Sequence, residues 1–484
     1  MKNIGNVKKD GQVRAVASGA LTDGTPVIVN SDGTVSVVSG SNVSENIGTD
    51  TVFESGNTIN ITGAYDANAQ KVVIIYQDSD NSMYGTAVVG TTSGNTISFG
   101  TPVVFESAQT SNISADYDSN AQKIVIAYTD QGNSSRGTSI VGTVSGTSIS
   151  FGTAVVHNST GTTIWNSIAY DANAQKVVVA YEDYFASRYG TAIVGTVSGT
   201  SISFGSETVF ESAHANHISI TYDSNAQKVV IAYRDNGNSN YGTAIVGTVS
   251  GTSISFGTAV VFNSGSTERP SIVYDSTNNK VVIAYRDVGN SSYGTAIVGT
   301  VSGTSISFGS EDVFESANVN YISAAYDANA QKVVVAYTDN GNTEYGTVAV
   351  GTVSGTSISF TTPSVLESAT SNYFKAIYDS SNNKVVIAYR DEGNTDKGTA
   401  RVFQAAYGST NITSENFIGF SDGAFADTQS AAINTANTID RNQSSLTAGQ
   451  TYFVQTDGTL GLTADDPSVT AGTAISATEL IVKG

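Results

Sequence analysis

A repeat of about 52 residues is the feature that most constrains the fold of this 484-residue chain. A Tyr-Asp pair recurs seven times, at steps of 52 residues with a single step of 53. The pairs are Tyr65-Asp66, Tyr117-Asp118, Tyr170-Asp171, Tyr222-Asp223, Tyr274-Asp275, Tyr326-Asp327 and Tyr378-Asp379. A period of this length is typical of architectures built by repeating one supersecondary unit.

Each repeat contains four short runs of strand-forming residues separated by turn residues. The Tyr-Asp run is followed by one such as Lys228–Tyr233, then by Gly-Thr-Ala-Ile-Val-Gly-Thr-Val and Thr-Ser-Ile-Ser-Phe-Gly. Val, Ile, Tyr and Thr in runs broken by Ser-Gly and Asn-Gly predict strands joined by hairpins. The second run is apolar on both faces, which predicts a strand buried between neighbouring sheets. We expect the Asp of each Tyr-Asp pair to accept backbone N–H bonds in the turn that follows.

Seven units of four strands predict an all-β fold, a seven-bladed β-propeller with four-stranded blades, in which radial repetition leaves only short, protected edges. The alternatives are a β-solenoid and a string of separate β-domains. A solenoid coil normally has a shorter period, and 52 residues are too few for an independent β-sandwich. The propeller is therefore the preferred prediction.

The two ends of the repeat array suggest how a ring would close. Residues 46–55 match the fourth strand of later repeats but precede the first complete repeat, and the last repeat loses the pattern after Phe403. We expect the amino-terminal strand to complete the last blade. Residues 411–420 are the alternative occupant of that edge.

A second, weaker repeat lies outside the array. Residues 21–35 match residues 446–460 at Leu-Thr, Gly, Val and Asp-Gly-Thr, and both segments predict hairpins turned at Asp-Gly. Because ring closure brings the chain ends together, the terminal segments are expected to form one small β-domain with the propeller inserted in it. The expected domains are residues 1–44 and 416–484 for the small domain and 45–415 for the propeller.

Composition excludes several classes of function. The chain has 42 acidic and 22 basic side chains, a net charge of −20 and no cysteine. The absence of cysteine excludes disulfide scaffolds, cysteine-ligated metals and thiol nucleophiles. No basic stripe is available to displace counterions from phosphates, so nucleic acid is not an expected partner. The first ten residues are followed by no apolar stretch long enough for a signal peptide or a membrane span, so neither export by that route nor membrane insertion is expected.

No motif predicts a cofactor or a metal. His157, His214 and His217 lack the spacing of zinc ligands, and neither a Gly-x-Ser-x-Gly motif nor a phosphate loop occurs. An Asp ends each second strand, often before Gly-Asn, but the alternating Asp array of a calcium loop is missing. Turn capping is the better explanation of these aspartates.

The repeats differ from one another at one set of positions. The run Gly-Thr-Val-Ser-Gly-Thr-Ser-Ile-Ser-Phe is identical in repeats two to six, whereas the position five residues before each Tyr-Asp tyrosine varies. This position holds Asn60, Asn112, Trp165, His217, Arg269, Tyr321 and Tyr373. The loops between the second and third strands vary as well, and all these positions are expected on one face. Variation confined to one face of a constant framework predicts a binding surface, because unconstrained drift should affect both faces equally.

The candidate ligand-binding residues follow from this comparison. They are Trp165, His217, Arg269, Tyr321 and Tyr373 around the mouth of the central channel, with Tyr184, Phe185 and Arg188 of one second-to-third loop forming a rim. Aromatic rings stack on sugars or bury against a protein epitope, and Arg269 can make paired bonds to a carboxylate or sulfate of an acidic glycan.

Glycoside hydrolysis by paired carboxylates is the enzymatic alternative. Its candidate acids, Glu182, Glu268 and Glu344, come from different repeats, and the Ser-x-Asp-x-Gly-x-x-Trp turns of sialidase-like propellers are absent. We therefore expect a protein that is not an enzyme.

The terminal segments carry a resemblance to a known class of protein. Residues 415–424, 446–460 and 471–484, together with an Ala-Ser-Gly-x-Leu-x-x-Gly-x-x-Val-x-Val-Asn pattern from Ala17 to Asn30, resemble the terminal module of tail-fibre-like structural proteins of marine bacteriophages. The resemblance covers about the outer quarter of the chain. It implies a virion component made in the host cytoplasm and released by lysis.

The resemblance and the variable face together suggest a tail fibre or appendage that binds a host-surface receptor, either a glycan or a protein. A capsid decoration or collar protein without a ligand is one alternative, and a cellular lectin-like adhesin is another. The expected partners are the receptor, other virion proteins and, in an oligomer, further copies of the chain.

Overall fold

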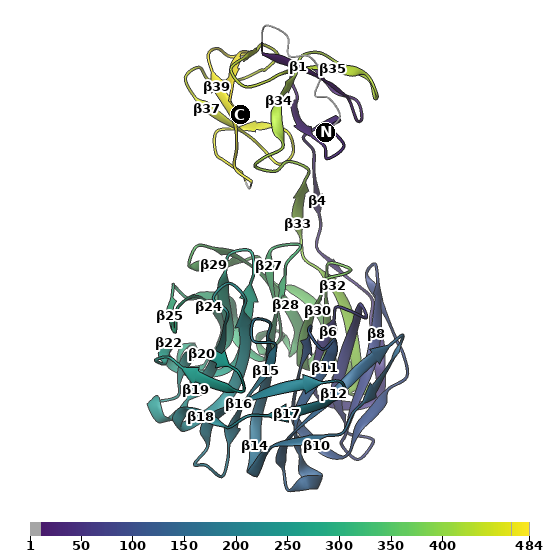
Figure 1. Ribbon diagram of the computed structural model, residues 1–484, viewed down its shortest axis with the longest axis vertical. Coiled ribbons are helices and arrows are strands. Elements are labelled where there is room, and N and C mark those ends of the chain that lie inside the picture. The colour runs from purple at the N-terminus through teal and green to yellow at the C-terminus, as the bar shows by residue number, and fades with distance from the viewer. Residues whose placement is uncertain (1–10, 466, 484) are drawn as a thin grey trace. The chain divides into compact units, whose positions relative to one another are not determined.

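The computed structural model describes residues 11–465 and 467–483. Residues 1–10, on which the prediction of no signal peptide partly rests, lie outside the described residues. The chain divides into two compact units, which we call the ring unit (residues 45–405) and the terminal unit (residues 1–44 and 406–484). Both units are built from antiparallel β-strands (Figure 1). Among the described residues, no helix has the length and apolarity needed to cross a bilayer.

Four kinds of strand recur in the ring unit. The long strands are β6 (Thr51–Asp66), β10 (Val103–Asp118), β14 (Val155–Asp171), β18 (Thr208–Asp223), β22 (Val260–Asp275), β26 (Asp312–Asp327) and β30 (Ser364–Asp379). The central strands are β7 (Lys71–Asp78), β11 (Lys123–Asp130), β15 (Lys176–Asp183), β19 (Lys228–Asp235), β23 (Lys280–Asp287), β27 (Lys332–Asp339) and β31 (Lys384–Asp391).

The remaining strands complete each repeat. The third strands are β8 (Tyr84–Ser93), β12 (Arg136–Ser145), β16 (Tyr189–Ser198), β20 (Tyr241–Ser250), β24 (Tyr293–Ser302), β28 (Tyr345–Ser354) and β32 (Lys397–Gln404). The short strands are β9 (Thr96–Phe99), β13 (Ser148–Phe151), β17 (Ser201–Phe204), β21 (Ser253–Phe256), β25 (Ser305–Phe308), β29 (Ser357–Phe360) and β5 (Asn46–Ile47). Short 3-10 turns follow five of the central strands: η1 (Gln131–Asn133), η2 (Asn236–Asn238), η3 (Val288–Asn290), η4 (Asn340–Asn342) and η5 (Glu392–Asn394).

Each long strand belongs to two repeats. The first part of β14 pairs with β12 of the preceding repeat, with Val155 opposite Ser139, and its second part pairs with β15, with Ile168 opposite Val179. The sequence comparison treats these two parts as separate strands joined by a loop. In the structure the strand continues through a bulge, even in β22, where the run contains Gly265 and Pro270.

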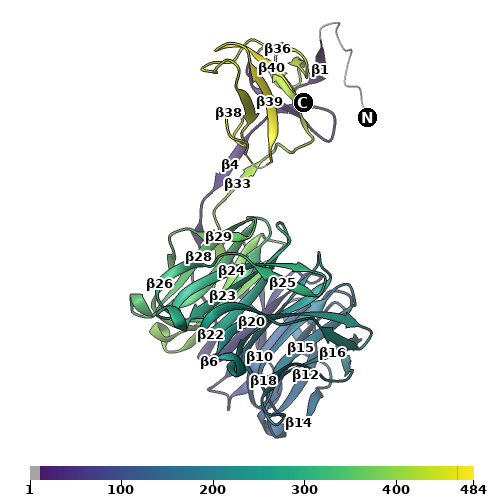
Figure 2. The same ribbon diagram turned by 90° about the vertical axis from the view of Figure 1, so that its left-hand side faces the viewer.

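The pairing network of the ring unit closes on itself. Within the described residues, 28 strands form one antiparallel network, of which Figure 2 shows β22 to β25. β32 pairs with β5 and β6, with Thr399 opposite Val52, which is the closure expected from the match at residues 46–55. The alternative segment, residues 411–420, lies in the terminal unit instead. Each long strand also contacts the next one, and β30 contacts β6, so the long strands form a closed circle.

The core of the ring unit consists of the central strands. Residues from Val229 to Tyr233 of β19 are fully buried, as the two-faced apolar pattern predicts. The tyrosine at the end of this run hydrogen-bonds to a carboxylate: the Tyr233 hydroxyl donates to Glu211 Oε2 at 3.0 Å. Tyr128 and Tyr337 make the same bond to a glutamate, so the repeat carries a polar anchor within an apolar layer.

The Tyr-Asp pairs tie neighbouring repeats together. The hydroxyl of Tyr117 accepts a hydrogen bond from the Asn68 backbone N–H of the preceding repeat at 3.2 Å. Tyr65 of the first repeat donates to Ser381 Oγ of the last at 2.6 Å, which joins the two ends of the array. Asp118 Oδ1 accepts bonds from the backbone N–H groups two and three residues ahead, at 3.0 and 2.8 Å, as predicted.

Within its described residues, the terminal unit contains two five-stranded sheets and one two-stranded pair. The first sheet has the order β1 (Gln12–Val16), β35 (Ser430–Asn434), β34 (Phe417–Ser421), β2 (Pro26–Val29) and β3 (Val35–Val37), so both ends of the chain contribute to it. The second sheet has the order β36 (Ile439–Asp440), β40 (Leu480–Val482), β39 (Val469–Ala474), β37 (Thr451–Val454) and β38 (Leu460–Gly461). Ile28, Phe420 and Val454 belong to one buried cluster shared by the two sheets.

The two matched hairpins have the same turn geometry. Asp32 Oδ1 accepts bonds from the backbone N–H and the hydroxyl of Thr34, and Asp457 Oδ1 accepts the equivalent bonds from Thr459. These bonds lower the pKa of both carboxyl groups. The carboxy-terminal boundary of the ring unit lies at residue 405, ten residues before the expected 415, because β33 (Tyr407–Thr410) pairs with β4 (Gly40–Val43) and not with a strand of the ring.

Candidate functional site

The seven variable positions share an unusual backbone conformation. All have a left-handed φ between 47° and 56°: Asn60 (52°), Asn112 (47°), Trp165 (56°), His217 (50°), Arg269 (51°), Tyr321 (47°) and Tyr373 (54°). Each lies where the register of the long strand shifts, for example between Ile164 and Ser167 of β14. These are β-bulges, which redirect a side chain and are common next to binding and active sites. A left-handed conformation costs a non-glycine residue about 1–2 kcal/mol.

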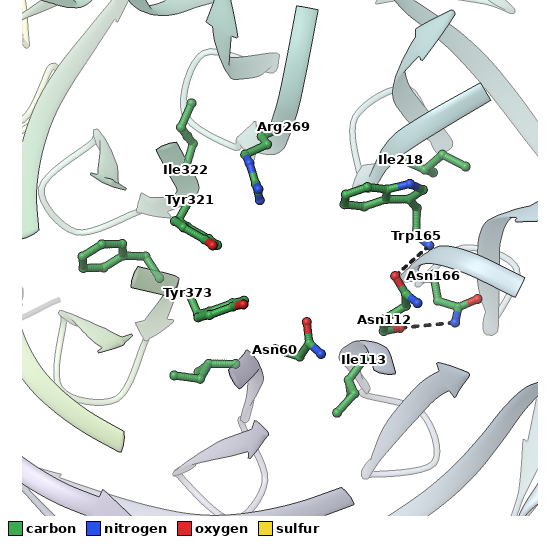
Figure 3. A pocket seen from close by; sticks show the side chains of 12 residues that line it. Asn60, Asn112, Ile113, Trp165, Asn166, Ile218, Arg269, Tyr321, Ile322 and Tyr373 are labelled. Atoms are coloured by element: carbon green, nitrogen blue, oxygen red, sulfur yellow. Dashed lines mark hydrogen bonds between the residues drawn. The ribbon is translucent and has the colours of Figure 1, made fainter. Parts of the chain in front are cut away.

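The bulges direct six of these seven side chains, all except His217, into one cavity. The cavity has a volume of about 220 Å³. It is lined by Asn60, Ile61, Asn112, Ile113, Trp165, Asn166, Ile218, Arg269, Tyr321, Ile322, Tyr373 and Phe374. Figure 3 shows the labelled side chains around an open centre, with the Arg269 guanidinium and the Tyr321 and Tyr373 hydroxyls directed into it. Six of the seven repeats place their variable side chain in this cavity, and the fourth repeat contributes Ile218 instead of its variable residue, His217.

Planar groups from consecutive repeats stack along one side of the cavity. The rings of Tyr321 and Tyr373 lie 4.6 Å apart, and the Arg269 guanidinium carbon lies 4.5 Å from the centre of the Tyr321 ring. The Trp165 ring packs against His217 with the ring centres 4.1 Å apart and the planes tilted by 38°, although His217 itself does not line the cavity. The five residues predicted from the sequence therefore contact one another in pairs between adjacent repeats.

Asparagine side chains form another part of the cavity wall. Asn112 Oδ1 accepts a bond from the Trp165 backbone N–H at 3.2 Å, and Asn166 Nδ2 donates to the Asn112 carbonyl oxygen at 3.2 Å. Asn60 Nδ2 donates to Gln77 Oε1 at 2.7 Å. The sequence comparison identified the positions of Asn60 and Asn112 but did not select them as ligand-binding residues, and it did not identify Asn166. Asparagine tolerates a left-handed φ, which is the one sequence signal for these bulges.

The cavity lies beside a cluster of arginines. Glu268 accepts a bond from Arg234 at 2.9 Å with one oxygen and from Arg286 at 2.7 Å with the other. Burial, together with the positive charges of Arg269, Arg234 and Arg286, lowers the pKa of His217 to about 3. Burial also lowers the pKa of Arg269. His217 is therefore neutral near neutral pH and contributes a flat, uncharged ring.

The predicted rim residues form a separate cluster. Tyr184, Phe185 and Arg188 lie in the loop between β15 and β16 and are not among the residues that line the cavity. The Arg188 guanidinium carbon lies 4.6 Å from the Tyr184 ring centre, and Phe185 is 68% exposed. Arg188 also lies 3.8 Å from the buried carboxylate of Glu182.

The candidate acids do not meet. Glu182 contacts Arg188 and His214, Glu268 bridges two arginines, and Glu344 lies in an exposed loop. Burial raises the pKa of Glu182 to about 7, and Arg188 opposes this shift. None of the three glutamates lines the cavity.

The aspartates that end the central strands cap turns, as predicted. Asp130 Oδ1 accepts a bond from the Asn133 backbone N–H at 3.1 Å, and Asp391 makes the equivalent bond to Asn394. Among the described residues, no group of three or more His, Asp and Glu side chains is arranged to hold a metal ion.

A second cavity, of about 400 Å³, lies further along the same long strands. It is lined by tyrosines of the Tyr-Asp pairs and contains Asp116 and Lys375. Asp116 accepts bonds from the backbone N–H groups of Tyr117 and Tyr170 at 2.8 and 2.7 Å. Burial raises the pKa of Asp116 and lowers that of Lys375, and each charge partly offsets the effect of burial on the other.

Comparisons with known proteins define the class of fold. No protein-family model matches the chain, and no curated protein sequence matches it. Among solved structures, the chain is similar to the BP39L lectin from Burkholderia pseudomallei, with a TM-score of 0.54 and 9% sequence identity over 74% of this chain and 99% of the lectin chain. It also matches a fungal alcohol oxidase of the AA5 family in complex with copper, with a TM-score of 0.47 and 10% identity over 82% of this chain and 94% of the oxidase chain. The ring unit is thus a repeated all-β fold of a kind that a lectin also has.

Proposed function

We propose that the ring unit is a seven-bladed β-propeller that binds a surface receptor, a glycan or a protein, in the cavity formed by the variable positions. The closed pairing network and the seven Tyr-Asp repeats support the architecture. The single observation that carries the binding role is the convergence of Trp165, Arg269, Tyr321 and Tyr373 on one cavity from strained, left-handed positions. Strain of this kind is found where a function maintains it.

The chemistry of the cavity fits carbohydrate. Aromatic faces that stack on sugar rings stand beside amides and hydroxyls that exchange hydrogen bonds with sugar hydroxyls. The similarity to a lectin is consistent with carbohydrate binding, and at 9% sequence identity it is a similarity of fold. The cavity residues include neither a carboxylate pair nor a nucleophile with an adjacent base, so binding is favoured over catalysis.

The biological setting proposed is a bacteriophage virion, in which the chain is a tail fibre or appendage assembled in the host cytoplasm and released by lysis. The resemblance of residues 415–424, 446–460 and 471–484 to phage terminal modules supports this setting. A capsid decoration or collar protein is the alternative without a ligand, and a cellular lectin-like adhesin is the alternative outside the virion. Immunogold labelling of particles separates the virion roles from the adhesin.

Glycan-array binding and adsorption to host cells test the binding role. Replacing Trp165 and Tyr373 by Ala removes two aromatic anchors and is expected to weaken binding by on the order of 2 kcal/mol or more, about 30-fold. The matched control replaces Thr200 and Ser201, which lie at the exposed turn between β16 and β17, at the opposite end of the repeat. If the control variant lost binding while the aromatic variants kept it, the assignment of the binding site to the face with the variable positions would be wrong.

A further inference from the structure

We infer that the cavity selects a sugar carrying one anionic group, a carboxylate or a sulfate ester, and that Arg269 is the residue that selects it. This inference rests on the proposed binding role of the cavity. It adds a charge requirement to that role, which aromatic stacking alone does not impose.

The first observation is the charge of the cavity wall. The chain carries a net charge of −20, yet none of the twelve residues that line the cavity is acidic and one of them is an arginine. The other polar residues that line the cavity are Asn60, Asn112, Asn166, Tyr321 and Tyr373, whose amides and hydroxyls are neutral hydrogen-bonding groups, together with the Trp165 indole. A cavity that presents a cation and neutral donors complements an anion.

The second observation is that Arg269 has no counter-ion. Other arginines of the described chain form ion pairs: Arg188, Arg234, Arg286, Arg390, Arg401 and Arg441. Among residues 11–465 and 467–483, Arg269 makes neither an ion pair nor a side-chain hydrogen bond. Its guanidinium carbon lies 4.5 Å from the centre of the Tyr321 ring. A partly buried guanidinium without a partner is unfavourable until an anion binds it.

The third observation explains why the neighbouring glutamate does not neutralise Arg269. Both oxygens of Glu268 are engaged, one by Arg234 and the other by Arg286. Of the three arginines Arg234, Arg269 and Arg286, two thus bond to the same single carboxylate, which leaves an excess of positive charge in this part of an acidic protein. The unpaired group of the three is the one that points into the cavity (Figure 3).

The geometry of Arg269 suits a planar or tetrahedral oxyanion. The Arg269 guanidinium carbon lies over the Tyr321 ring, and among the described residues no group accepts a hydrogen bond from the Arg269 N–H groups, so these donors are available to a ligand. Guanidinium edges bind carboxylates and sulfates through two parallel hydrogen bonds. Trp165 and Tyr373 offer rings that can pack on the sugar that bears the charge.

The test compares three probes that share one sugar ring: methyl glucoside, methyl glucuronide and glucose 6-sulfate. Binding of each to the full chain is measured by titration calorimetry or saturation-transfer NMR. We expect the glucuronide or the sulfate to bind on the order of 10- to 100-fold more tightly than the neutral glucoside. Whichever of the glucuronide and the glucose sulfate binds more tightly shows whether the cavity selects a carboxylate or a sulfate ester.

Arg269→Gln tests the assignment of the residue, because it removes the charge and retains hydrogen-bonding capacity. The preference for the acidic probe is expected to fall to within a few-fold of unity. Arg136→Gln is the matched control: Arg136 also makes no ion pair in the described part of the chain, but it begins β12 and does not line the cavity. This control is expected to retain the preference.

The outcomes separate the inference from the proposed function. Equal binding of neutral and acidic probes, lost on Trp165→Ala, overturns the charge requirement and leaves the proposed function standing. A preference that survives Arg269→Gln overturns the role of Arg269. If no sugar binds and cell adsorption does not depend on Trp165, the proposed function fails, and the inference fails with it.

Discussion

The left-handed backbone at Arg269 predicts an inverted response to two small substitutions. In an ordinary strand, glycine is less stable than alanine by about 0.5–1 kcal/mol because it loses more conformational freedom on folding. At Arg269, φ is 51°, where alanine keeps a steric penalty of about 1–2 kcal/mol and glycine has none. We therefore expect Arg269→Gly to be more stable than Arg269→Ala.

The magnitude follows from these two terms. Both variants lose the same cation–π contact with Tyr321, worth about 0.5–1 kcal/mol, so this contribution cancels in their difference. Subtracting an entropic cost of about 0.5–1 kcal/mol from a relief of about 1–2 kcal/mol leaves the glycine variant more stable by up to about 1.5 kcal/mol, with a central value of about 0.75 kcal/mol. Arg269 suits the comparison because it makes no side-chain hydrogen bond or ion pair in the described chain that one substitution would disturb differently.

Urea or guanidinium unfolding of the full chain, followed by a signal from the ring unit, measures the difference. The midpoints are compared at equal slope, since a change in slope would indicate a change in the denatured state. Thr221 is the control: it lies on the long strand β18, lines the second cavity and does not have a positive φ. There, Thr221→Gly is expected to be less stable than Thr221→Ala. If glycine is also the less stable variant at Arg269, the strain argument is wrong.

Two further predictions concern ring closure and pH. A chain that lacks residues 1–55 loses β5 and the start of β6, which pair with β32. Its ring unit is expected to melt at a temperature well below that of a control chain that lacks only residues 1–44. Equal melting temperatures would exclude closure of the ring by this strand. Burial raises the pKa of Glu182 from 4.5 to about 7, so the folded state binds the proton more tightly than the unfolded state, and this group makes the unfolding free energy fall as pH rises between those values. Glu182→Gln is expected to reduce the change of unfolding free energy with pH between about pH 5 and pH 7, as measured by denaturant unfolding. Glu344→Gln, on an exposed loop, is the control and should leave this pH dependence unchanged. An unchanged pH dependence in Glu182→Gln would show that Glu182 does not have the raised pKa.

The sequence predicts the framework well because the framework repeats. A strand that is buried on both faces, as Lys228–Asp235 is, shows the same apolar run in every copy, and the Asp turn after each Tyr-Asp pair uses a local bond that spacing alone reveals. Closure is predictable for the same reason, since residues 46–55 carry a recognisable strand without a repeat of their own. The boundary at residue 405 is less predictable because residues 406–415 match nothing in the array.

The site is harder to predict because its decisive features lie between repeats. Trp165, Arg269 and Tyr321 are poor candidates for a left-handed φ by residue type, so the bulges are visible in the sequence only through Asn60 and Asn112. The isolation of Arg269 depends on Glu268 being held by Arg234 and Arg286, which come from two different repeats. Neither the left-handed backbone nor the isolation of Arg269 can be predicted from the residues of a single repeat. The convergence of the variable side chains on one cavity can be predicted, because a ring brings equivalent positions of all repeats together.

The strain also bears on whether the variable positions drifted without selection. Five of the seven carry Trp, His, Arg or Tyr in a conformation that costs each about 1–2 kcal/mol, or about 5–10 kcal/mol together. That sum is comparable to the whole unfolding free energy of a typical domain, about 5–15 kcal/mol. Asparagine at two equivalent bulges shows that the framework accepts a residue with a smaller penalty, and glycine would have none. Drift under a requirement for folding alone should therefore favour Asn and Gly at these positions, so large planar side chains at five of them, four of which line the cavity, favour selection for contacts made there.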